Sequence, residues 1–368
     1  MSGSIYGKNF CISTWGESHG KAIGVVVDGC PSGLELDEED IQAFLDRRKP
    51  GQSRFATQRN ESDKVEILSG IFDGKTTGAP ISLLVKNQDQ HSNDYENIAS
   101  VYRPGHADFT WTQKYGFRDY RGGGRSSGRE TIGRVAGGAI AVKILATLGV
   151  SIQSYSRKIG EIEISDERFD FNESKKNPFA LPDVQIIEKV EQYVQKQMEH
   201  QDSVGGIIEC KVLSLPVGIG EPVFDKLDAN LAKAMLSIGA VKGFEMGDGF
   251  ASANLKGSEH NDAFRLGKQQ AIIKTSNHAG GVLGGISDGS DLVFRVAIKP
   301  TASIAQVQSS VNQNNEEVDI QIQGRHDPII VPRAVVVVES MAALTILDLL
   351  LQSMSSRLDK IQKFFHTT

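Results

Sequence analysis

Four arginines and three consecutive glycines occur together in residues 118–131, in the run Arg-Asp-Tyr-Arg-Gly-Gly-Gly-Arg-Ser-Ser-Gly-Arg-Glu-Thr. Glycine lets the main chain approach a ligand closely. An apolar run with helical spacing follows over residues 132–148, and Ser127 and Glu130 have the spacing of a capping box. The free N–H groups at the start of such a helix attract anions. The stretch therefore predicts an anion-binding site; the alternative is a solvated loop whose arginines form surface ion pairs.

Two other turns carry an imidazole, the usual proton donor near neutral pH. His19 lies in the turn 14–20 and is flanked by small residues. His106 follows Pro-Gly in the turn 102–108, which also carries Arg103. We expect His106 and Arg103 to face one ligand. The alternatives are that His19 only closes its turn by a backbone hydrogen bond, and that Asp108 pairs with Arg103 on the surface.

The first predicted helix begins at the N-cap Asp37, with Asp40 in its first turn, and ends on the basic residues 47–49 before a proline. Basic residues at a helix C-terminus often only complement the helix dipole. Here Arg54 and Arg59 continue the basic segment in a Gly-Gln-Ser loop. This continuation favours a site for a small polyanion.

Two positions in the last quarter of the chain could complete a site. A predicted strand, 292–298, ends in the turn 299–304, which offers an ammonium and two hydroxyls and suits a phosphate. Further on, Pro328 holds Asp327 out of helical geometry, so that its carboxylate can point into a site.

The elements that would position these residues are strands and helices of ordinary length. Strands are predicted at residues 6–12, 22–27, 64–69, 81–85, 207–215 and 292–298. Helices are predicted after Asp37, at 132–148, 183–200 and 222–238, and after Pro332. Residues 161–177 are expected to be a surface connection, and the glycine-rich stretch 239–289 a long structured loop.

Composition limits the possible classes of protein. The 368 residues contain 40 basic and 46 acidic side chains, a formal net charge of -6, so nucleic-acid binding would need a local basic patch. Three cysteines without a C-x-x-C pair suit reduced thiols and indicate no metal framework. No secretory signal is recognisable, and the apolar segment 334–351 carries two acids, as expected of a buried helix. We expect a cytoplasmic protein that binds neither nucleic acid nor membrane.

Two nucleotide-binding motifs are not matched. Residues 70–76 resemble a phosphate-binding loop but have three residues between the glycines, where four are needed, and Pro80 ends any helix early. No G-x-G-x-x-G follows a predicted strand. An RNA-binding protein with arginine-glycine segments and a phosphotransferase are the alternative functions; the second would need a magnesium ligand set and a nucleotide loop.

Six motifs in order resemble those of the chorismate synthase family: Gly16-Glu-Ser-His19-Gly, Arg103-Pro-Gly-His106, Arg125-Ser-Ser-Gly-Arg-Glu-Thr, His278-Ala-Gly-Gly, Lys299-Pro-Thr and Gly324-Arg-His-Asp-Pro. The resemblance runs from about Tyr6 into the last apolar helix and leaves out the polar tail from about residue 352. It implies one large domain over residues 1–368, of α/β (α+β) class, folded as a β-α-β sandwich and assembled as a homotetramer.

The resemblance also implies the chemistry. The family eliminates phosphate from 5-enolpyruvylshikimate 3-phosphate by an anti-1,4-elimination and yields chorismate. It requires reduced FMN without consuming it, and NADPH is a possible external reductant.

Residue roles follow from the same motifs. His19 would donate a proton to the leaving phosphate, His106 would manage the proton at flavin N1, and Asp327, stabilised by Arg325, would be a base working with flavin N5. The substrate would be held by Arg48, Arg54, Arg103 and Arg129. The flavin would contact Arg125, Ser126, Ser127, Gly239, Ala240, Gly284, Lys299, Pro300, Thr301, Ala302, Ser303 and Arg325. Ala302 stands where many relatives have serine, and Gly239 where a larger residue is usual.

Overall fold

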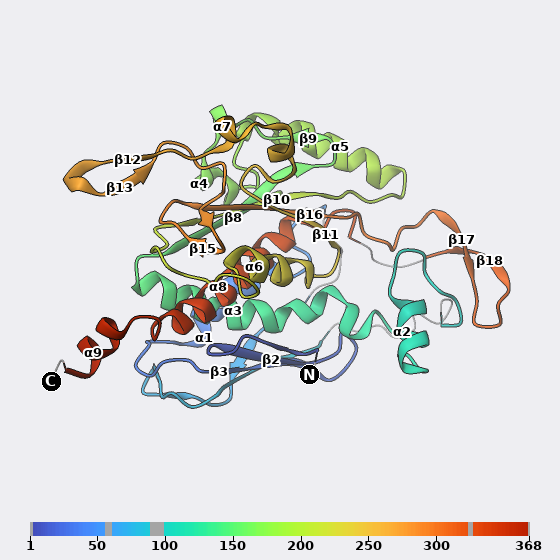
Figure 1. Ribbon diagram of the computed structural model, residues 1–368. Coiled ribbons are helices and arrows are strands. Elements are labelled where there is room, and N and C mark those ends of the chain that lie inside the picture. Colours follow the sequence, from blue (N-terminus) through green and yellow to red (C-terminus); the bar gives the residue numbers. More distant parts are fainter. Residues whose placement is uncertain (1–2, 56–60, 89–98, 323–326, 367–368) are drawn as a thin grey trace.

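Two five-stranded sheets enclose a layer of helices in the computed structural model, which describes residues 3–55, 61–88, 99–322 and 327–366 (Figure 1). The first sheet has the order β1 (Ile5–Tyr6), β2 (Cys11–Gly16), β3 (Ala22–Asp28), β7 (Ile81–Lys86) and β4 (Val65–Ile67). The second has the order β11 (Val241–Met246), β16 (Leu292–Ile298), β10 (Gly206–Leu213), β8 (Ser151–Ile159) and β9 (Ile162–Glu163). All neighbouring strands in both sheets are antiparallel.

The middle layer contains α1 (Glu38–Arg48), α3 (Thr131–Thr147), α6 (Leu227–Leu236) and α8 (Val331–Ser353). Helix α3 packs on β2 and β3 of the first sheet, whereas α8 packs on β8 and β10 of the second, and the two helices pack on each other. This arrangement confirms the expected α/β (α+β) class and β-α-β sandwich. One continuous cluster of buried side chains contains residues from both sheets.

Shorter elements surround the sandwich. The helices are α2 (Asp108–Tyr115), α4 (Phe171–Ser174), α5 (Ile187–Glu199), α7 (Gly257–His260) and α9 (Leu358–His366). The hairpins are β5–β6 (Ile71–Phe72, Lys75–Thr76), β12–β13 (Phe264–Leu266, Ile272–Lys274), β14–β15 (Val282–Leu283, Ile286–Ser287) and β17–β18 (Val307–Val311, Glu317–Gln321). The phosphate-loop lookalike 70–76 thus forms a β-hairpin with no helix after it.

Side-chain patterns explain the layers. Strand β16 alternates buried and partly buried residues because one of its faces meets the helices. Most residues of helix α8 are apolar and buried, as expected of a helix that is covered on most sides. It is long and apolar enough to cross a membrane, but 83% of its apolar stretch is buried inside the fold, which confirms the prediction of a buried helix.

Several predicted bounds are wrong. The strand predicted at 6–12 is interrupted by a turn at Gly7, whose φ is +94°. The helix predicted at 222–238 begins only at Leu227, because residues 221–225 form a turn closed by the Glu221 N–H and the Asp225 carbonyl. The presumed loop 239–289 contains strand β11 and two hairpins, and the presumed connection 161–177 contributes the buried Ile162 and Ile164.

The capping box predicted from Ser127 and Glu130 is also absent. The Ser127 hydroxyl accepts from the Arg129 N–H and caps a short 3-10 turn, Gly128–Glu130, that precedes α3. Glu130 instead accepts from Arg134 Nε at 2.9 Å and from the Thr14 hydroxyl at 3.3 Å. These tertiary partners outcompete the local cap.

Candidate active site

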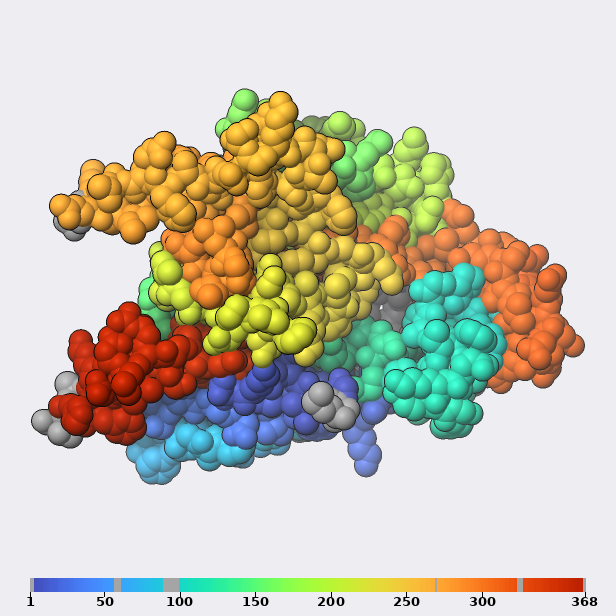
Figure 2. All heavy atoms as spheres, in the orientation of Figure 1, coloured from blue at the N-terminus to red at the C-terminus, as the bar shows by residue number. Residues whose placement is uncertain are grey.

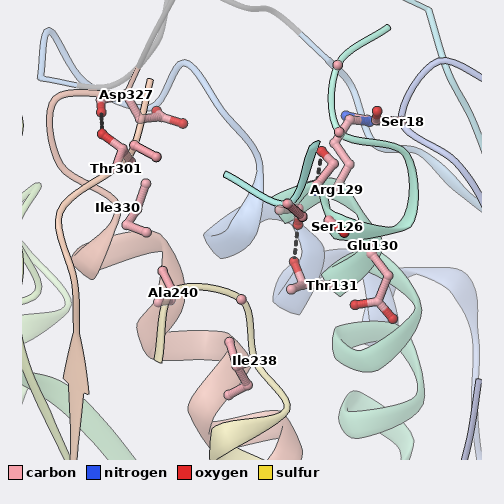
Figure 3. Close-up of a pocket in the computed structure, with 18 of the residues that line it drawn as sticks. Ser18, Ser126, Arg129, Glu130, Thr131, Ile238, Ala240, Thr301, Asp327 and Ile330 are labelled. Atoms are coloured by element: carbon pink, nitrogen blue, oxygen red, sulfur yellow. Dashed lines mark hydrogen bonds between the residues drawn. The ribbon is translucent and has the colours of Figure 1, made fainter. Parts of the chain in front are cut away.

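A cavity of about 660 Å³ lies where the first turns of α3 and α8 meet the loops at one end of the sandwich. Figure 3 shows Asp327 and Thr301 on one side with Ile330 and Ala240 below them, Ser18 and Arg129 on the other side, and Ile238 lower down. Its volume is in the range of small-molecule sites. Both helices present their N-terminal ends, and these ends favour a bound anion.

The lining is strongly basic. It contains seven Arg or Lys side chains and two acids: Arg48, Arg103, Arg125, Arg129, Arg134, Lys299, Arg333, Glu130 and Asp327. Burial, followed by the nearby charge of Lys242, lowers the pKa of Lys299. A bound anion would reverse that effect, because it would stabilise the charged ammonium. The cavity therefore suits a ligand that carries several negative charges.

His106 is oriented by a buried carboxylate. Its Nδ1 lies 3.0 Å from Asp108 Oδ1 and 3.1 Å from the Arg103 guanidinium. The carboxylate can only accept, and the Arg103 NH2 group already donates to Asp108 Oδ1 and to the Gly122 carbonyl, both at 2.8 Å, so we place a proton on Nδ1 that is donated to Asp108. Nε2 is then the nitrogen that can exchange a proton. Asp108 thus does pair with Arg103. The pair is buried inside the fold, whereas the alternative placed it on the surface.

His19 lies in the connection between β2 and β3 and is only 7% exposed. Its Nδ1 lies 3.1 Å from the hydroxyl of the buried Ser18. Gly122, at φ +68°, packs against this ring, and a Cβ there would be 2.5 Å from Nδ1 and from Cε1. The glycine run therefore allows a loop to cover the imidazole closely, a use that its sequence alone does not reveal.

Asp327 lies in the segment that leads into α8, which begins at Val331. Its carboxylate lies 2.5 Å from Arg333 NH1, and its carbonyl accepts from the Thr301 hydroxyl at 2.8 Å. Arg325, the partner expected from the sequence, lies outside the described residues. Arg333 also donates from Nε to the carbonyl of Arg48 at 3.0 Å, so it joins the Asp327 segment to the end of α1.

The expected flavin contacts lie close together. Arg125 donates to the Thr14 hydroxyl at 2.7 Å and to the Gly16 carbonyl at 3.2 Å, and these bonds fix its guanidinium at the end of β2. The other members of this set that line the cavity are Ser126, Ser127, Gly239, Ala240, Lys299, Thr301, Ala302 and Ser303. They come from the turn before α3, the turn between α6 and β11, and the segment after β16.

Three expected residues do not line this cavity. Arg54 is exposed and lies 3.3 Å from Glu191. Gly284 lies in the turn of the β14–β15 hairpin, and Pro300 follows β16 without contributing to the lining. Arg59 lies outside the described residues, as Arg325 does. The structure brings together His19, His106, Asp327, Arg48, Arg103 and Arg129.

Sequence reasoning missed the carboxylates behind the arginines. Asp63 and Glu61 are 0% and 2% exposed and contact Arg129, and Asp63 also contacts Arg48. Nothing in the local sequence distinguishes them from surface acids. It also missed Arg333, which looks like an ordinary residue in the first turn of an apolar helix.

Comparison with known proteins identifies the family. The chorismate synthase family model matches residues 10–351. A chorismate synthase of Lachnospira eligens is 59% identical over 365 residues, which are 99% of this chain and 100% of the relative, and one of Agathobacter rectalis is 60% identical over 365 residues, 99% of each chain. A crystal structure of chorismate synthase superposes with a TM-score of 0.77 at 30% identity and covers 98% of this chain and 97% of the other. The chain belongs to the chorismate synthase family.

Proposed function

We propose that this cavity is the active site in which the chain performs the reaction of its family. As a chorismate synthase it is a carbon–oxygen lyase of the shikimate pathway, which eliminates phosphate from 5-enolpyruvylshikimate 3-phosphate and yields chorismate. The observation that carries the assignment of the cavity is the convergence of seven basic side chains and two helix N-termini on a space that also holds His19, His106 and Asp327.

Reduced FMN fits the same cavity. A Cβ added at Gly128 or Gly239 would meet no atom within 4 Å, so a ligand can approach the backbone closely at both positions. Ile238, Ala240, Ile330, Ala334 and Val337 form an apolar floor suited to a flat ring, and Lys299 and Arg125 supply charge for a phosphate. The reduced flavin, when bound, supplies an electron-rich ring that promotes loss of phosphate without net oxidation.

The residues of the chain bind the substrate and transfer protons. Arg48, Arg103 and Arg129 hold the carboxylates and the phosphate of the substrate, and His19 gives a proton to the leaving phosphate. His106 exchanges a proton through Nε2, the nitrogen left over when Nδ1 donates to Asp108. Asp327 accepts a proton, with Arg333 stabilising its charge.

The RNA-binding alternative is disfavoured because arginines of the run 118–131 form ion pairs within the chain. Arg118 is 9% exposed and lies 2.8 Å from Asp108, while Arg121 lies 2.6 Å from Asp119. The run therefore does not present a stripe of available guanidinium groups along a surface. We further propose that the subunits have a single domain and form a homotetramer in the cytoplasm. NADPH is a possible external reductant of the flavin.

The test is anaerobic turnover by the purified chain. With reduced FMN and the substrate, we expect phosphate and chorismate in equal amounts and no net flavin oxidation. Equal turnover with oxidised FMN would overturn the assignment.

The residue roles are tested by single-turnover rates of His19→Ala, His106→Ala and Asp327→Asn. Each should lose about 10²–10⁴-fold, the usual contribution of a general acid or base. His200→Ala, an exposed histidine after α5, is the control and should retain the wild-type rate. If Asp327→Asn stays within about threefold of wild type, Asp327 is not the base.

A further inference from the structure

One carboxylate holds two of the proposed substrate arginines at once. Asp63, which is 0% exposed, receives a hydrogen bond from Arg48 on Oδ2 and one from Arg129 NH1 on Oδ1 at 3.0 Å. Both arginines line the cavity, whereas Asp63 does not. It therefore lies behind them, where it can fix their side chains without touching a ligand.

The electrostatics favour an ionised Asp63 at this place. Burial would raise the pKa of the carboxyl, but the charges of Arg48 and Arg129 outweigh burial and lower it. Burial lowers the pKa of Arg48 to about 10, and Asp63 opposes that effect. Without the carboxylate, the two guanidinium groups would repel each other in a dry environment.

The backbone of Asp63 is itself unusual, with φ +45°. Aspartate is one of the few residues other than glycine that adopt this left-handed conformation readily. In this conformation the Asp63 carboxylate lies between the two arginines.

Most of the remaining donors of Arg48 and Arg129 have an acceptor among the described residues, but one buried donor does not. Arg129 donates from Nε and NH2 to Asn87 Oδ1 at 3.0 and 2.8 Å, and Arg48 NH1 lies 3.4 Å from the Gly128 carbonyl. The Nε atom of Arg48, by contrast, is buried, and no described residue accepts its hydrogen bond. A buried donor without an acceptor is costly, and an anionic ligand could satisfy it.

We infer that Asp63 is a positioning residue that holds Arg48 and Arg129 side by side as a clamp for the anionic groups of the substrate. The inference rests on the proposed function, because it takes the cavity as the substrate site. Positioning and a simple charge effect predict opposite changes in the affinity for an anion when Asp63 is neutralised. Removing a negative charge next to an anion site should tighten anion binding, whereas losing the clamp should weaken it.

The test is Asp63→Asn, which keeps the shape and removes the charge. We expect KM for the substrate to rise about 10- to 100-fold, as when hydrogen bonds to a charged group are misplaced. The single-turnover rate at saturation and the dissociation constant of FMN should stay within about threefold, because Asp63 contacts neither proposed catalytic nor proposed flavin residues. An unchanged or lower KM would overturn the inference.

A buried carboxylate elsewhere provides the matched control. Asp183 is 0% exposed, lies 2.7 Å from Arg168, and does not line the cavity. Asp183→Asn should reduce stability while KM stays at the wild-type value. If Asp183→Asn raises KM as much as Asp63→Asn does, the effect is general destabilisation and the inference fails.

Two further measurements keep the test decisive if Asp63→Asn folds poorly. Asp63→Glu preserves the charge but displaces both arginines, so its KM should also rise; a wild-type KM would show that Asp63 only balances charge. In a double-mutant cycle, Arg129→Lys should reduce the effect of the Asp63 substitution on KM and leave the part that acts through Arg48, whereas fully additive effects would contradict positioning through Arg129. Failure of the proposed function is distinct, since the wild-type chain would then not release phosphate.

Discussion

At the scale of single residues, carboxylates organise the cations of the site. Asp108 is 5% exposed and accepts hydrogen bonds from the Arg103 main chain and side chain and from His106 Nδ1, and it lies 2.8 Å from Arg118. Burial alone would raise the pKa of Asp108, but the hydrogen bonds from Arg103 and His106 outweigh burial and hold that pKa far below its usual range. The residue should therefore contribute stability that depends on pH.

This contribution has a definite sign. Because the folded-state pKa is depressed, the contribution is fully present above the unfolded pKa near 3.9 and is lost as pH falls below it. Asp108→Asn lacks this titration. We expect the difference in unfolding free energy between wild type and Asp108→Asn to shrink by about 1.3 kcal/mol between pH 5 and pH 3. Denaturant unfolding at several pH values measures it, and a constant difference would contradict the prediction.

Arg125 and Arg121 offer a second comparison at this scale. Arg125 lines the cavity and is held by Thr14, whereas Arg121 pairs with Asp119 outside it. We expect Arg125→Ala to weaken FMN binding by about 1.5–3 kcal/mol, the range for a hydrogen bond to a charged group. Arg121→Ala is the control and should leave the FMN dissociation constant unchanged. Equal affinities of both variants would remove Arg125 from the flavin site.

At the scale of elements, the crossing of α3 and α8 fixes the position of the cavity, because the first turns of both helices line it. The helices approach closely at Gly138, where a Cβ would lie 2.3 Å from Ser340 Cβ and 2.7 Å from its Cα. No side-chain rotation can relieve a clash with Cα. A glycine in the middle of a helix is otherwise unfavourable, so close packing explains it.

Gly138→Ala should therefore force the helices apart and destabilise the fold by about 1–3 kcal/mol, as overpacking usually does. The control is Gly257→Ala in α7, where an added Cβ meets nothing within 4 Å. It should be neutral or stabilise by up to about 1 kcal/mol. Thermal unfolding of the two variants measures the contrast, and a Gly138→Ala protein as stable as wild type would show that the helices can separate without cost.

The elements also show what sequence could and could not predict. Helix α8, strand β16 and the capped start of α1 follow from periodicity and local capping, and the structure confirms them. Gly122 and Gly123 of the predicted anion-binding stretch line the cavity beside Arg125 and Arg129, but their role in binding a ligand stays a prediction. The start of α6 and the tertiary partners of Glu130 depend on residues distant in sequence, as do the buried positions of Asp63 and Asp108. Local pattern carries no information about them.

At the scale of the whole molecule, one projecting hairpin exposes an apolar surface. The hairpin β12–β13 extends away from the sandwich (Figures 1 and 2). It carries exposed apolar side chains on both strands: Phe264 at 56%, Leu266 at 74%, Ile272 at 74% and Ile273 at 49%. A two-stranded hairpin is marginally stable by itself, and exposed apolar patches indicate interaction sites. In the proposed homotetramer, this hairpin should pack against another subunit.

The last prediction tests that role. Leu266 and Ile272 are opposite each other in the hairpin, so replacing both with aspartate places two charges on the same pair. We expect light scattering at micromolar concentration to show a tetramer for wild type and smaller species for the double variant, since burying unpaired charges in an interface is costly. Phe364→Asp with Phe365→Asp is the matched control, because these exposed residues lie in α9, beyond the end of the family match at residue 351. It should remain tetrameric. A monomeric wild type would contradict the proposed tetramer itself. A stable tetramer of the hairpin variant would show that the hairpin is not the interface and would leave its exposed apolar surface unexplained.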